Sequence, residues 1–327
     1  MESQCIPKPT TIVSQVHLLD ECNLKCKHCY VGDWRFSPRP MPSTETMMAR
    51  IRKIVDFSKK QGFKRHVMNI SGGEPTLRSD IFEIIKEVRK NDANPLLLTN
   101  GMLFTKEYVK KIKNAGCDSV QISIEGPEDL NDLIRGRGTF QKIMSAIRNC
   151  KDEGFNVTAG VTVSKVNISG FCDLVGTLDG KVDKFHVSEL VQIGAGTGME
   201  PLSKNERFEL YKFVYAWNGK SKVFIEDPTY CSISPDLADK RAGCGAFICL
   251  MCVDTDGSVY PCRRAPMKMG TVDDLEGAWL SEIGVKLRSR DFTGQCGRCD
   301  LKWSCGGCRA YATSKGNILG SDERCFL

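Results

Sequence analysis

The sequence lacks any long apolar run. Within its 327 residues there is no stretch of about 18 consecutive apolar residues, and the N-terminus has no apolar segment of the signal-peptide type. We therefore expect neither a membrane span nor a secretory signal. A basic block interleaved with aromatic residues is also missing, because the net charge is only +6 and Lys and Arg are spread along the chain. We expect no nucleic-acid partner.

Cysteine is the residue that the sequence has in excess. The chain holds 17 cysteines, an odd number, and many of them stand only a few residues apart. A disulfide framework is typical of short secreted domains, whereas closely spaced cysteines without a secretory signal are typical of metal ligands. The apolar content of 41% and the charged content of 26% are those of a globular protein. We predict a metal-binding protein of the reducing cytoplasm.

Strand and helix patterns alternate through the first part of the chain. Short apolar strands are predicted at 14–19, 66–70, 96–99, 119–124, 157–163 and 184–190. Amphipathic helices are predicted at 43–62, 80–91, 105–115, 139–153, 169–179 and 204–217. Alternation of this kind indicates βαβ units and a parallel sheet, and six units are fewer than the eight of a complete barrel. The predicted fold is α/β, a partial (β/α)6 barrel or an open sheet.

The last hundred residues differ in character. They have few long apolar runs and hold most of the cysteines, and Asp256-Gly257 between 250–253 and 258–260 predicts a hairpin. We expect a small, loop-rich domain that metal holds together. The predicted division is an N-terminal arm at 1–14, a barrel core at 15–228 and a cysteine-rich domain at 229–327.

Polar residues and glycines follow the predicted strands. In parallel α/β folds the functional groups lie at the carboxyl ends of the strands. The residues found at those ends are Cys22 to Cys29, Gly72, Gly73, Glu74, Asn100, Ser123, Glu125, Ser164 and Glu189. We expect them to share one rim of the sheet and to form the site.

Three cysteines after the first strand have the spacing Cys22-x3-Cys26-x2-Cys29. Three thiolates can converge on one inorganic centre and leave a coordination position open, as catalytic metal sites do. Thiolates suit both iron–sulfur clusters and zinc. A zinc knuckle that takes His28 as a fourth ligand, or plain buried thiols, are the alternatives at this point.

Together with two further segments, the three cysteines resemble the motifs of a known family. The three cysteines with His28 before the last, and Ser71-Gly72-Gly73-Glu74-Pro75 after the second predicted strand, resemble the radical S-adenosylmethionine (SAM) superfamily. The C-terminal cysteines resemble its SPASM extension, which carries two auxiliary clusters. Their order is Cys244-x12-Gly257-x4-Cys262, Cys296-x2-Cys299-x5-Cys305-x2-Cys308 and Cys325, with two residues instead of the usual three before Cys308. The resemblance covers 15–327.

The resemblance implies the catalytic centre. Cys22, Cys26 and Cys29 would hold a [4Fe-4S] cluster whose open iron is chelated by the amino and carboxylate groups of SAM. The remaining expected SAM-binding residues are His28, Gly72, Gly73 and Glu74 (the last three for the methionyl amino group), Ser123 and Arg135 (for its carboxylate, with Arg137 as the rival), and Asn100 and Ser164 (for ribose or carboxylate). A guanidinium pairs with a carboxylate in two hydrogen bonds.

The resemblance also implies two auxiliary [4Fe-4S] clusters, three clusters in all. Closing both takes eight thiolates, and the pattern supplies seven, so the eighth is Cys249 or Cys252. The usual placement favours Cys249. The first set is then Cys244, Cys249, Cys262 and Cys308, and the second is Cys296, Cys299, Cys305 and Cys325.

Three functions follow from these expectations. The preferred one is oxidative modification of a peptide or protein side chain after reductive cleavage of SAM to a 5′-deoxyadenosyl radical, with the auxiliary clusters as electron relay and ferredoxin or flavodoxin as electron donor. The alternative is a cofactor-maturing enzyme whose substrate is a haem-like tetrapyrrole or a pterin. A non-catalytic iron–sulfur electron carrier is the third, although a carrier has no need for the segment Gly72–Glu74.

At one position the sequence differs from a group of relatives in a way that bears on the substrate. Sulfatase-maturing relatives have an aspartate base after the cysteine at the position of Cys262, and here Arg263 and Arg264 follow it. Sulfatase maturation is therefore not expected. A basic pair near the cavity favours an acidic partner, such as an acidic peptide or a carboxylate-bearing tetrapyrrole. A solvated pair at the end of a hairpin is the alternative.

Overall fold

The fold is built on one ten-stranded sheet in a computed structural model that describes residues 9–32, 38–233 and 243–327. The strands are β1 (Thr11–His17), β2 (Arg65–Ser71), β3 (Asn94–Thr99), β4 (Ser119–Ser123), β5 (Asn156–Val163), β6 (Lys184–Glu189), β7 (Lys222–Ile225), β8 (Leu250–Val253), β9 (Ser258–Tyr260) and β10 (Gly270–Thr271). The sheet order is β10-β9-β8-β1-β2-β3-β4-β5-β6-β7. Pairing is parallel from β8 to β7 and antiparallel between β8, β9 and β10.

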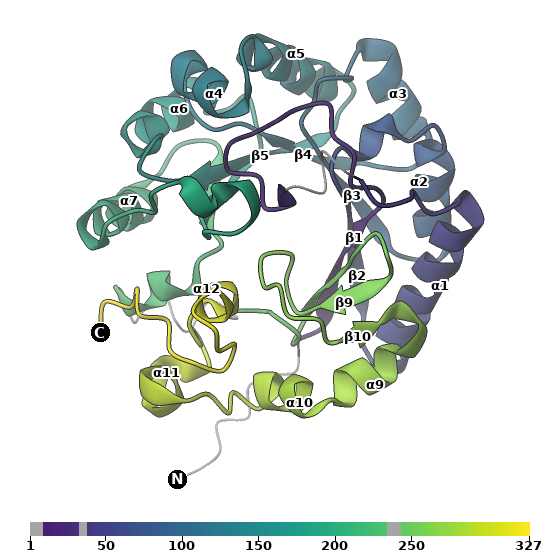
Figure 1. Cartoon of the computed structure of the whole chain (residues 1–327). Helices are drawn as coiled ribbons and strands as arrows, with labels where there is room; N and C mark the ends of the chain where they lie inside the picture. Colours follow the sequence, from purple (N-terminus) through teal and green to yellow (C-terminus); the bar gives the residue numbers. More distant parts are fainter. Residues whose placement is uncertain (1–8, 33–37, 234–242) are drawn as a thin grey trace.

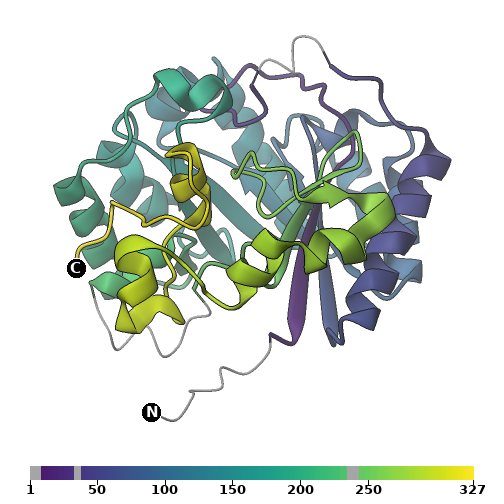
Figure 2. The same ribbon diagram turned by 60° about the horizontal axis from the view of Figure 1, so that its bottom comes forward.

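The described helices are α1 (Thr44–Lys60), α2 (Ile81–Lys90), α3 (Lys106–Asn114), α4 (Glu128–Arg135), α5 (Thr139–Asp152), α6 (Phe171–Leu178), α7 (Lys204–Ala216), α9 (Leu275–Leu280), α10 (Glu282–Arg288), α11 (Gly294–Arg298) and α12 (Arg309–Ser314). Helices α1 to α7 cover the outer face of this sheet, whereas α12 begins at the cavity on its inner side. Figure 1 shows α1 to α7 in an arc around the strands, with α9 to α11 on the remaining side. In Figure 2 this C-terminal part lies in front of the open side of the sheet.

The expected α/β fold with a partial barrel is confirmed. All six predicted strands are present, in the order in which the sequence gives them, and the predicted helices lie within a few residues of their expected bounds. Ser43 caps α1 as its sequence pattern indicates, because its hydroxyl accepts a hydrogen bond from the Thr46 N–H at 3.2 Å. The sheet stays open, with β10 and β7 at its two edges.

Three features were not predicted from the sequence. The first strand begins at Thr11 rather than Ser14, so the expected boundary between 14 and 15 falls inside β1. The short strand β7 extends one edge, and α4 lies between β4 and α5. At the other edge β8 pairs in parallel with β1, so the segment predicted as a separate cysteine-rich domain contributes strands to the barrel sheet.

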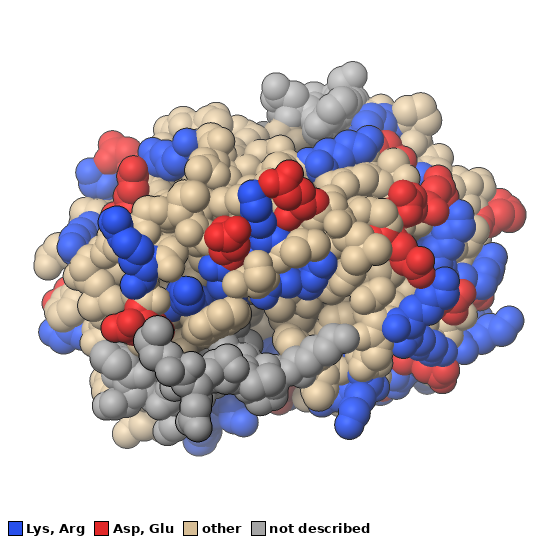
Figure 3. Space-filling view, turned by 90° about the horizontal axis from the view of Figure 1, so that it is seen from below, with Lys and Arg blue, Asp and Glu red and all other residues tan. Residues whose placement is uncertain are grey.

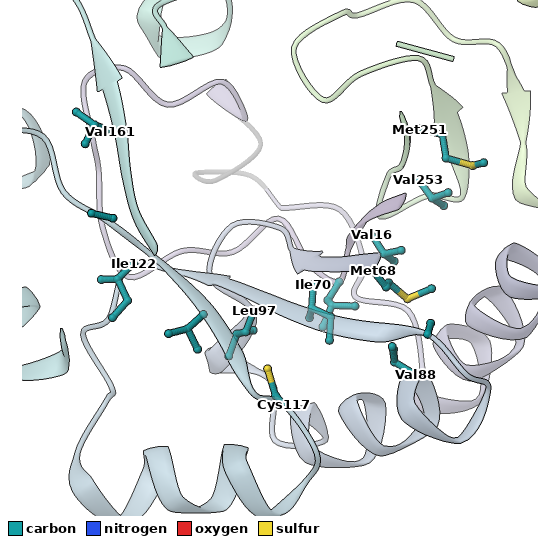
Figure 4. Packing of buried hydrophobic residues seen from close by; sticks show 14 of the residues in the cluster. Val16, Met68, Ile70, Val88, Leu97, Cys117, Ile122, Val161, Met251 and Val253 are labelled. Carbon is teal, nitrogen blue, oxygen red and sulfur yellow. The ribbon is translucent and has the colours of Figure 1, made fainter. Parts of the chain in front are cut away.

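The core lies between the sheet and its outer helices. Met68 and Ile70 of β2, Leu97 of β3 and Ile122 of β4 have no exposed surface, and neither has Val88 of α2. Figure 4 shows these apolar side chains gathered on the helix-facing side of the strands. Each fully buried side chain of this size stabilises the fold by about 1.5–3 kcal/mol. The outward positions of the strands are thereby used for packing, which leaves the inward positions for the site.

The surface carries charges of both signs. Figure 3 shows Lys and Arg side chains interspersed with Asp and Glu over the face seen there. Elsewhere on the chain's exterior, Lys60 of α1 and Glu276 of α9 form an exposed ion pair at 3.0 Å. None of the helices described is both long and apolar enough to cross a membrane.

Candidate active site

Two loops leave the sheet side by side at the carboxyl ends of β1 and β2. The Gly73 N–H donates to the Leu19 carbonyl at 2.7 Å, and the Glu74 N–H donates to the Glu21 carbonyl at 2.8 Å. A Cβ atom on Gly73 would lie 2.1 Å from the Glu21 oxygen, and one on Gly72 would lie 2.4 Å from the Leu19 oxygen. The glycine pair therefore holds the backbone that leads directly into the cysteine loop.

The three cysteines of that loop face one cavity of about 170 Å³. The backbone N–H of Leu24 lies 3.4 Å from the Cys22 sulfur. Burial raises the pKa of the Cys22 thiol to about 11, so a bound metal centre has to displace this proton. The other predicted site residues that line the cavity are His28, Gly72, Gly73, Glu74, Asn100, Ser123 and Arg135. The structure thus brings together residues from the ends of β1, β2, β3 and β4.

Glu74 is a buried carboxylate at the inner wall of this cavity. Its Oε1 accepts hydrogen bonds from the Thr76 and Thr99 hydroxyls at 2.6 and 2.7 Å, and from the Thr76 N–H at 3.2 Å. Its Oε2 accepts one, from the Asn100 N–H at 2.7 Å. Burial raises the pKa of Glu74. Because a carboxylate oxygen can accept at least two hydrogen bonds, Oε2 retains capacity for a further donor such as an ammonium group.

Asn100 connects the end of β3 to the cysteine loop. Its side-chain N–H₂ donates to the Asn23 Oδ1 at 2.7 Å and lies 3.9 Å from the Cys22 sulfur. Its Oδ1 accepts from the Met102 N–H at 3.0 Å. These contacts orient the cysteine loop, a role that the sequence did not suggest. The expected contact of Asn100 with ribose or carboxylate stays a prediction.

His28 and Arg135 meet on one carboxylate, that of Glu125 at the end of β4. The Glu125 Oε1 is 3.0 Å from the His28 Nε2 and 2.8 Å from the Arg135 Nη1, and its Oε2 accepts from the Thr162 N–H at 2.8 Å. Burial opposes ionisation, but the His28 imidazole and then the Arg135 guanidinium hold the pKa of Glu125 below its ordinary value. Sequence reasoning placed Glu125 on the rim without a role, and the structure makes it the anchor of two expected ligand-binding residues.

Two buried nitrogen atoms in this wall have no hydrogen-bond partner within the described residues, the His28 Nδ1 and the Arg135 Nε. Burying polar atoms without a partner costs about 1–3 kcal/mol each, so a polar ligand in the cavity would relieve the cost. Thiolates from three cysteines together with a guanidinium and a buried carboxylate fit a cluster and an amino-acid-bearing cofactor. The donor set is therefore compatible with the group that the sequence resemblance implies.

Of the two serines expected to bind SAM, Ser123 lines the cysteine-loop cavity and Ser164 does not. Ser123 lines the cavity at the end of β4. The structure does not bring Ser164 there, because its hydroxyl lies 3.1 Å from the Asn167 Oδ1 and its N–H donates to the same oxygen at 2.8 Å. The Asn167 side chain is itself fixed by donating to the Glu125 and Thr162 carbonyls. The rival Arg137 is exposed, whereas Arg135 is buried.

The two expected auxiliary sets of cysteines each converge on a cavity. Members of the first set line a cavity of about 840 Å³ on the inner side of the sheet: Cys244, Cys249, Cys262 and Cys308. Members of the second set line a small cavity of about 20 Å³ within the C-terminal segment: Cys296, Cys299, Cys305 and Cys325. In the part of the chain that the structure describes, no three Cys, His, Asp or Glu side chains form a compact site for a single metal ion.

Cys249 and Cys252, the two candidates for the eighth auxiliary ligand, face different neighbours. Cys252 lies opposite Gln15 in the β8–β1 pairing, and its sulfur is 3.8 Å from the His17 Nε2. Cys249 instead shares the larger cavity with the other three members of its set. Of the two candidates, Cys249 is thus the one that lines the cavity with the expected set, and its role as the eighth ligand stays a prediction.

Arg263 and Arg264 stand where the two larger cavities meet. Both line the cysteine-loop cavity and the 840 Å³ cavity, as do His186 and Gln121. Their side chains are only 13% and 12% exposed, so the alternative of a solvated pair is wrong. The Oε2 of Glu226 is 2.8 Å from the Arg264 Nη2 and 3.3 Å from the Arg263 Nη2.

One carboxylate therefore faces two guanidinium groups at this junction. Burial opposes the ionisation of Glu226, but Arg264 and Arg263 hold its pKa well below the usual range. Arg264 also donates to the Glu189 carbonyl at 3.1 Å, while its Nε is buried without a partner among the described residues. Two guanidinium groups thus share one carboxylate, and Arg264 retains capacity for another acceptor.

Known proteins resemble this chain over most of its length. A 34% identical relative is the pre-heme d1 synthase of Dinoroseobacter shibae, over 98% of this chain and 87% of that protein. The AdoMet-dependent heme synthase of Methanosarcina barkeri is 28% identical over 93% of both. Among solved structures, Streptococcus suis SuiB bound to its precursor peptide SuiA matches the fold with a TM-score of 0.75 at 17% identity, over 98% of this chain and 76% of that one.

A family model matches the part of the chain that holds the cysteine loop. The model of the radical SAM superfamily matches residues 16–177, which hold the cysteine loop, Gly72–Glu74 and the ends of β1 to β5. The cysteine-rich C-terminal segment agrees with the SPASM extension of the maturases in this family. The chain belongs to the radical SAM superfamily and carries a C-terminal SPASM domain.

Proposed function

We propose that this radical SAM enzyme modifies a carboxylate-bearing tetrapyrrole in the maturation of a haem-like cofactor. The observation that carries the proposal is the arginine pair Arg263 and Arg264, which has only 13% and 12% of its side-chain surface exposed and lies at the junction between the cysteine-loop cavity and the 840 Å³ cavity. The volume of the larger cavity is within the range of roughly 300–1,000 Å³ that is typical for pockets that bind small molecules and cofactors. The relatives named as heme and pre-heme d1 synthases support the same class of substrate.

The residues around the cysteine loop would hold the cofactors. We expect Cys22, Cys26 and Cys29 to ligate a [4Fe-4S] cluster, with SAM on its open iron. When bound, this pair supplies a carbon-centred radical that removes a hydrogen atom from the substrate. Gly72–Glu74 would receive the methionyl amino group through the remaining capacity of the Glu74 Oε2, and Ser123 and Arg135 the carboxylate.

The protein's own part is binding, orientation and exclusion of water. Arg135 is held by Glu125 at 2.8 Å, so its guanidinium is fixed before a ligand arrives. Arg264 is fixed in the same way by Glu226 and by the Glu189 carbonyl. A substrate carboxylate that reaches Arg264 therefore stays beside the cysteine-loop cavity without further ordering of the side chain.

A peptide or protein side chain is the second candidate substrate, and it was preferred from the sequence alone. An acidic peptide would satisfy the same arginine pair, and the neighbour SuiB is bound to a precursor peptide. The ranking changes because the 34% identical relative is a tetrapyrrole enzyme by name, whereas 17% identity to SuiB carries the fold alone. The electron-carrier alternative is not retained, since the family is one of enzymes.

Other expectations are carried forward as part of this proposal. We infer two auxiliary clusters, on the cysteine sets that line the 840 Å³ and 20 Å³ cavities. We also infer a one-electron donor such as ferredoxin or flavodoxin, and a cytoplasmic location, because open clusters need a reducing environment. The three-part division of the chain stays a prediction as well.

Equilibrium binding tests the substrate class. The anaerobically reconstituted protein is titrated with metal-free coproporphyrin III, which has four carboxylates, and with its tetramethyl ester, while porphyrin fluorescence is followed. We expect the free acid to bind and Arg264→Gln to weaken it by about 10–100-fold, as the loss of a charged hydrogen-bonded contact of about 1.5–3 kcal/mol requires. Arg52→Gln, at a half-exposed arginine on α1, is the matched control. Equal binding of acid and ester, or preference for an acidic peptide, would contradict the proposal.

A further inference from the structure

At the junction of the two larger cavities, His186 lies beside Arg263 and Arg264 and carries an imidazole that can bind a metal. It lies in the middle of β6, and its ring lines both the cysteine-loop cavity and the 840 Å³ cavity. The β6–β7 register places Phe224 directly beside it, and the two rings stack with centroids 5.8 Å apart and planes within 8° of each other. This stacking fixes the plane of the imidazole, so the edge of the ring that carries the nitrogen atoms keeps a defined direction.

The ring nitrogens of His186 are available for a ligand. Within the part of the chain that the structure describes, neither has a hydrogen-bond partner. Burial lowers the pKa of His186 to about 4, and the nearby Arg263 and Arg264 act in the same direction while Glu226 opposes them. The imidazole is therefore neutral at pH 7 and offers a lone pair.

The other three histidines of the chain are committed elsewhere. The His28 Nε2 is 3.0 Å from Glu125, and the His17 Nδ1 is 2.9 Å from Asp254. The His66 Nε2 is 2.6 Å from the Ser14 hydroxyl, and His66 lines none of the three cavities. A neutral imidazole that faces a cavity without a partner is a common ligand of iron, including the iron of haem.

We propose that His186 is an axial ligand to the iron of an iron-bearing tetrapyrrole substrate whose peripheral carboxylates lie on Arg263 and Arg264. The inference rests on the proposed function and adds two things to it, the metal state of the substrate and its orientation. A planar macrocycle held by iron at its centre and by carboxylates at its edge has a defined position relative to the cysteine loop. Two independent contacts thus select which edge of the ring faces the radical source.

The test compares iron and metal-free forms of one porphyrin. Ferric coproporphyrin III and metal-free coproporphyrin III are each titrated into the reconstituted full-length protein, with absorption and electron paramagnetic resonance as readouts. We expect the wild type to give the spectrum of an imidazole-ligated iron. In His186→Ala that spectrum is lost and iron porphyrin binds at least about 10-fold more weakly, while metal-free porphyrin binds as in the wild type. Added imidazole restores the ligated spectrum.

Two further variants separate ligation from folding. His186→Met replaces one axial ligand by another and is expected to shift the spectrum to that of a thioether ligand. His66→Gln removes the other histidine with a pKa near 4, which lines none of the three cavities, and is expected to leave both titrations unchanged.

The outcomes distinguish the two claims. If the wild type binds neither porphyrin, the proposed function fails and the inference fails with it. If both porphyrins bind, but the iron spectrum is the same in the wild type, His186→Ala and His186→Met, the axial-ligand role is overturned and the proposed function is not. An effect of His186→Ala on the metal-free porphyrin equal to that on the iron porphyrin would also overturn it, because the side chain would then serve packing alone.

Discussion

Gly73→Ala adds one methyl group at the point where the glycine pair meets the cysteine loop. The new Cβ would lie 2.1 Å from the Glu21 carbonyl oxygen and 2.3 Å from that of Asp20. To reach even 3.0 Å the loop would have to move by roughly 0.9 Å, the difference between 3.0 and 2.1 Å. The atoms that must move are backbone, so no side-chain rotation can relieve the contact.

The cost of this change follows from two terms. Overpacking of a tight site costs about 1–3 kcal/mol. The displaced loop also weakens the hydrogen bonds from Gly73 to Leu19 and from Glu74 to Glu21, each worth about 1 kcal/mol. The expected loss is about 2–5 kcal/mol, concentrated on the segment that leads into Cys22 rather than on the core between sheet and helices.

Iron content measures the loss of the cluster on the cysteine loop, and urea unfolding measures the loss of stability. With three four-iron clusters the reconstituted wild type should hold about twelve iron atoms per chain, and Gly73→Ala about eight, as should the variant with Cys22, Cys26 and Cys29 all changed to alanine. Gly176→Ala in α6 is the matched control, because its Cβ meets nothing within 4 Å and should raise helix stability by about 0.5–1 kcal/mol. Wild-type iron content and an unchanged urea midpoint in Gly73→Ala would refute the steric argument.

Three further changes test other parts of the account. Cys249→Ser should remove about four iron atoms per chain while Cys252→Ser keeps them, and the reverse result would reassign the eighth ligand. Glu125→Gln should destabilise the apoprotein by about 3–5 kcal/mol in urea, because it leaves a buried guanidinium without its counter-charge, and a change below 1 kcal/mol would contradict that pairing. His66, whose pKa falls from an ordinary 6.5 to about 4 through burial, binds a proton more readily in the unfolded state, so stability should be lost as pH falls from 6.5 to 4. His66→Gln should remove about 3 kcal/mol of this pH dependence, and a wild-type pH profile in that variant would disprove its origin.

The barrel and the rim were accessible to sequence reasoning because they depend on local patterns. Period-two and helical periodicities are set by burial within each element, so β1 to β6 could be placed within a few residues. The position of a strand end then fixes which residues share the rim, and Cys22, Glu74, Asn100 and Ser123 were found in this way.

The features that the sequence did not predict depend on contacts between segments that are distant in the chain. The pairing of β8 with β1 joins residues more than two hundred positions apart, and no local pattern records such a partner. Ser164 directly follows β5, and Ser123 is the last residue of β4, but the Asn167 side chain takes the Ser164 hydroxyl away from the cavity. The low exposure of Arg263 and Arg264 is made possible by their pairing with Glu226, which follows another strand, so the sequence alone left a solvated pair open.

Turnover of a tetrapyrrole is the most direct test of the central claim. The reconstituted enzyme is incubated without oxygen with SAM, a one-electron reductant and ferric coproporphyrin III, and both 5′-deoxyadenosine and the porphyrin are followed by mass spectrometry. We predict 5′-deoxyadenosine in amounts that match a porphyrin of changed mass, with neither product formed by the variant that lacks Cys22, Cys26 and Cys29. Formation of 5′-deoxyadenosine with an unaltered porphyrin, alongside modification of an acidic peptide, would contradict the account.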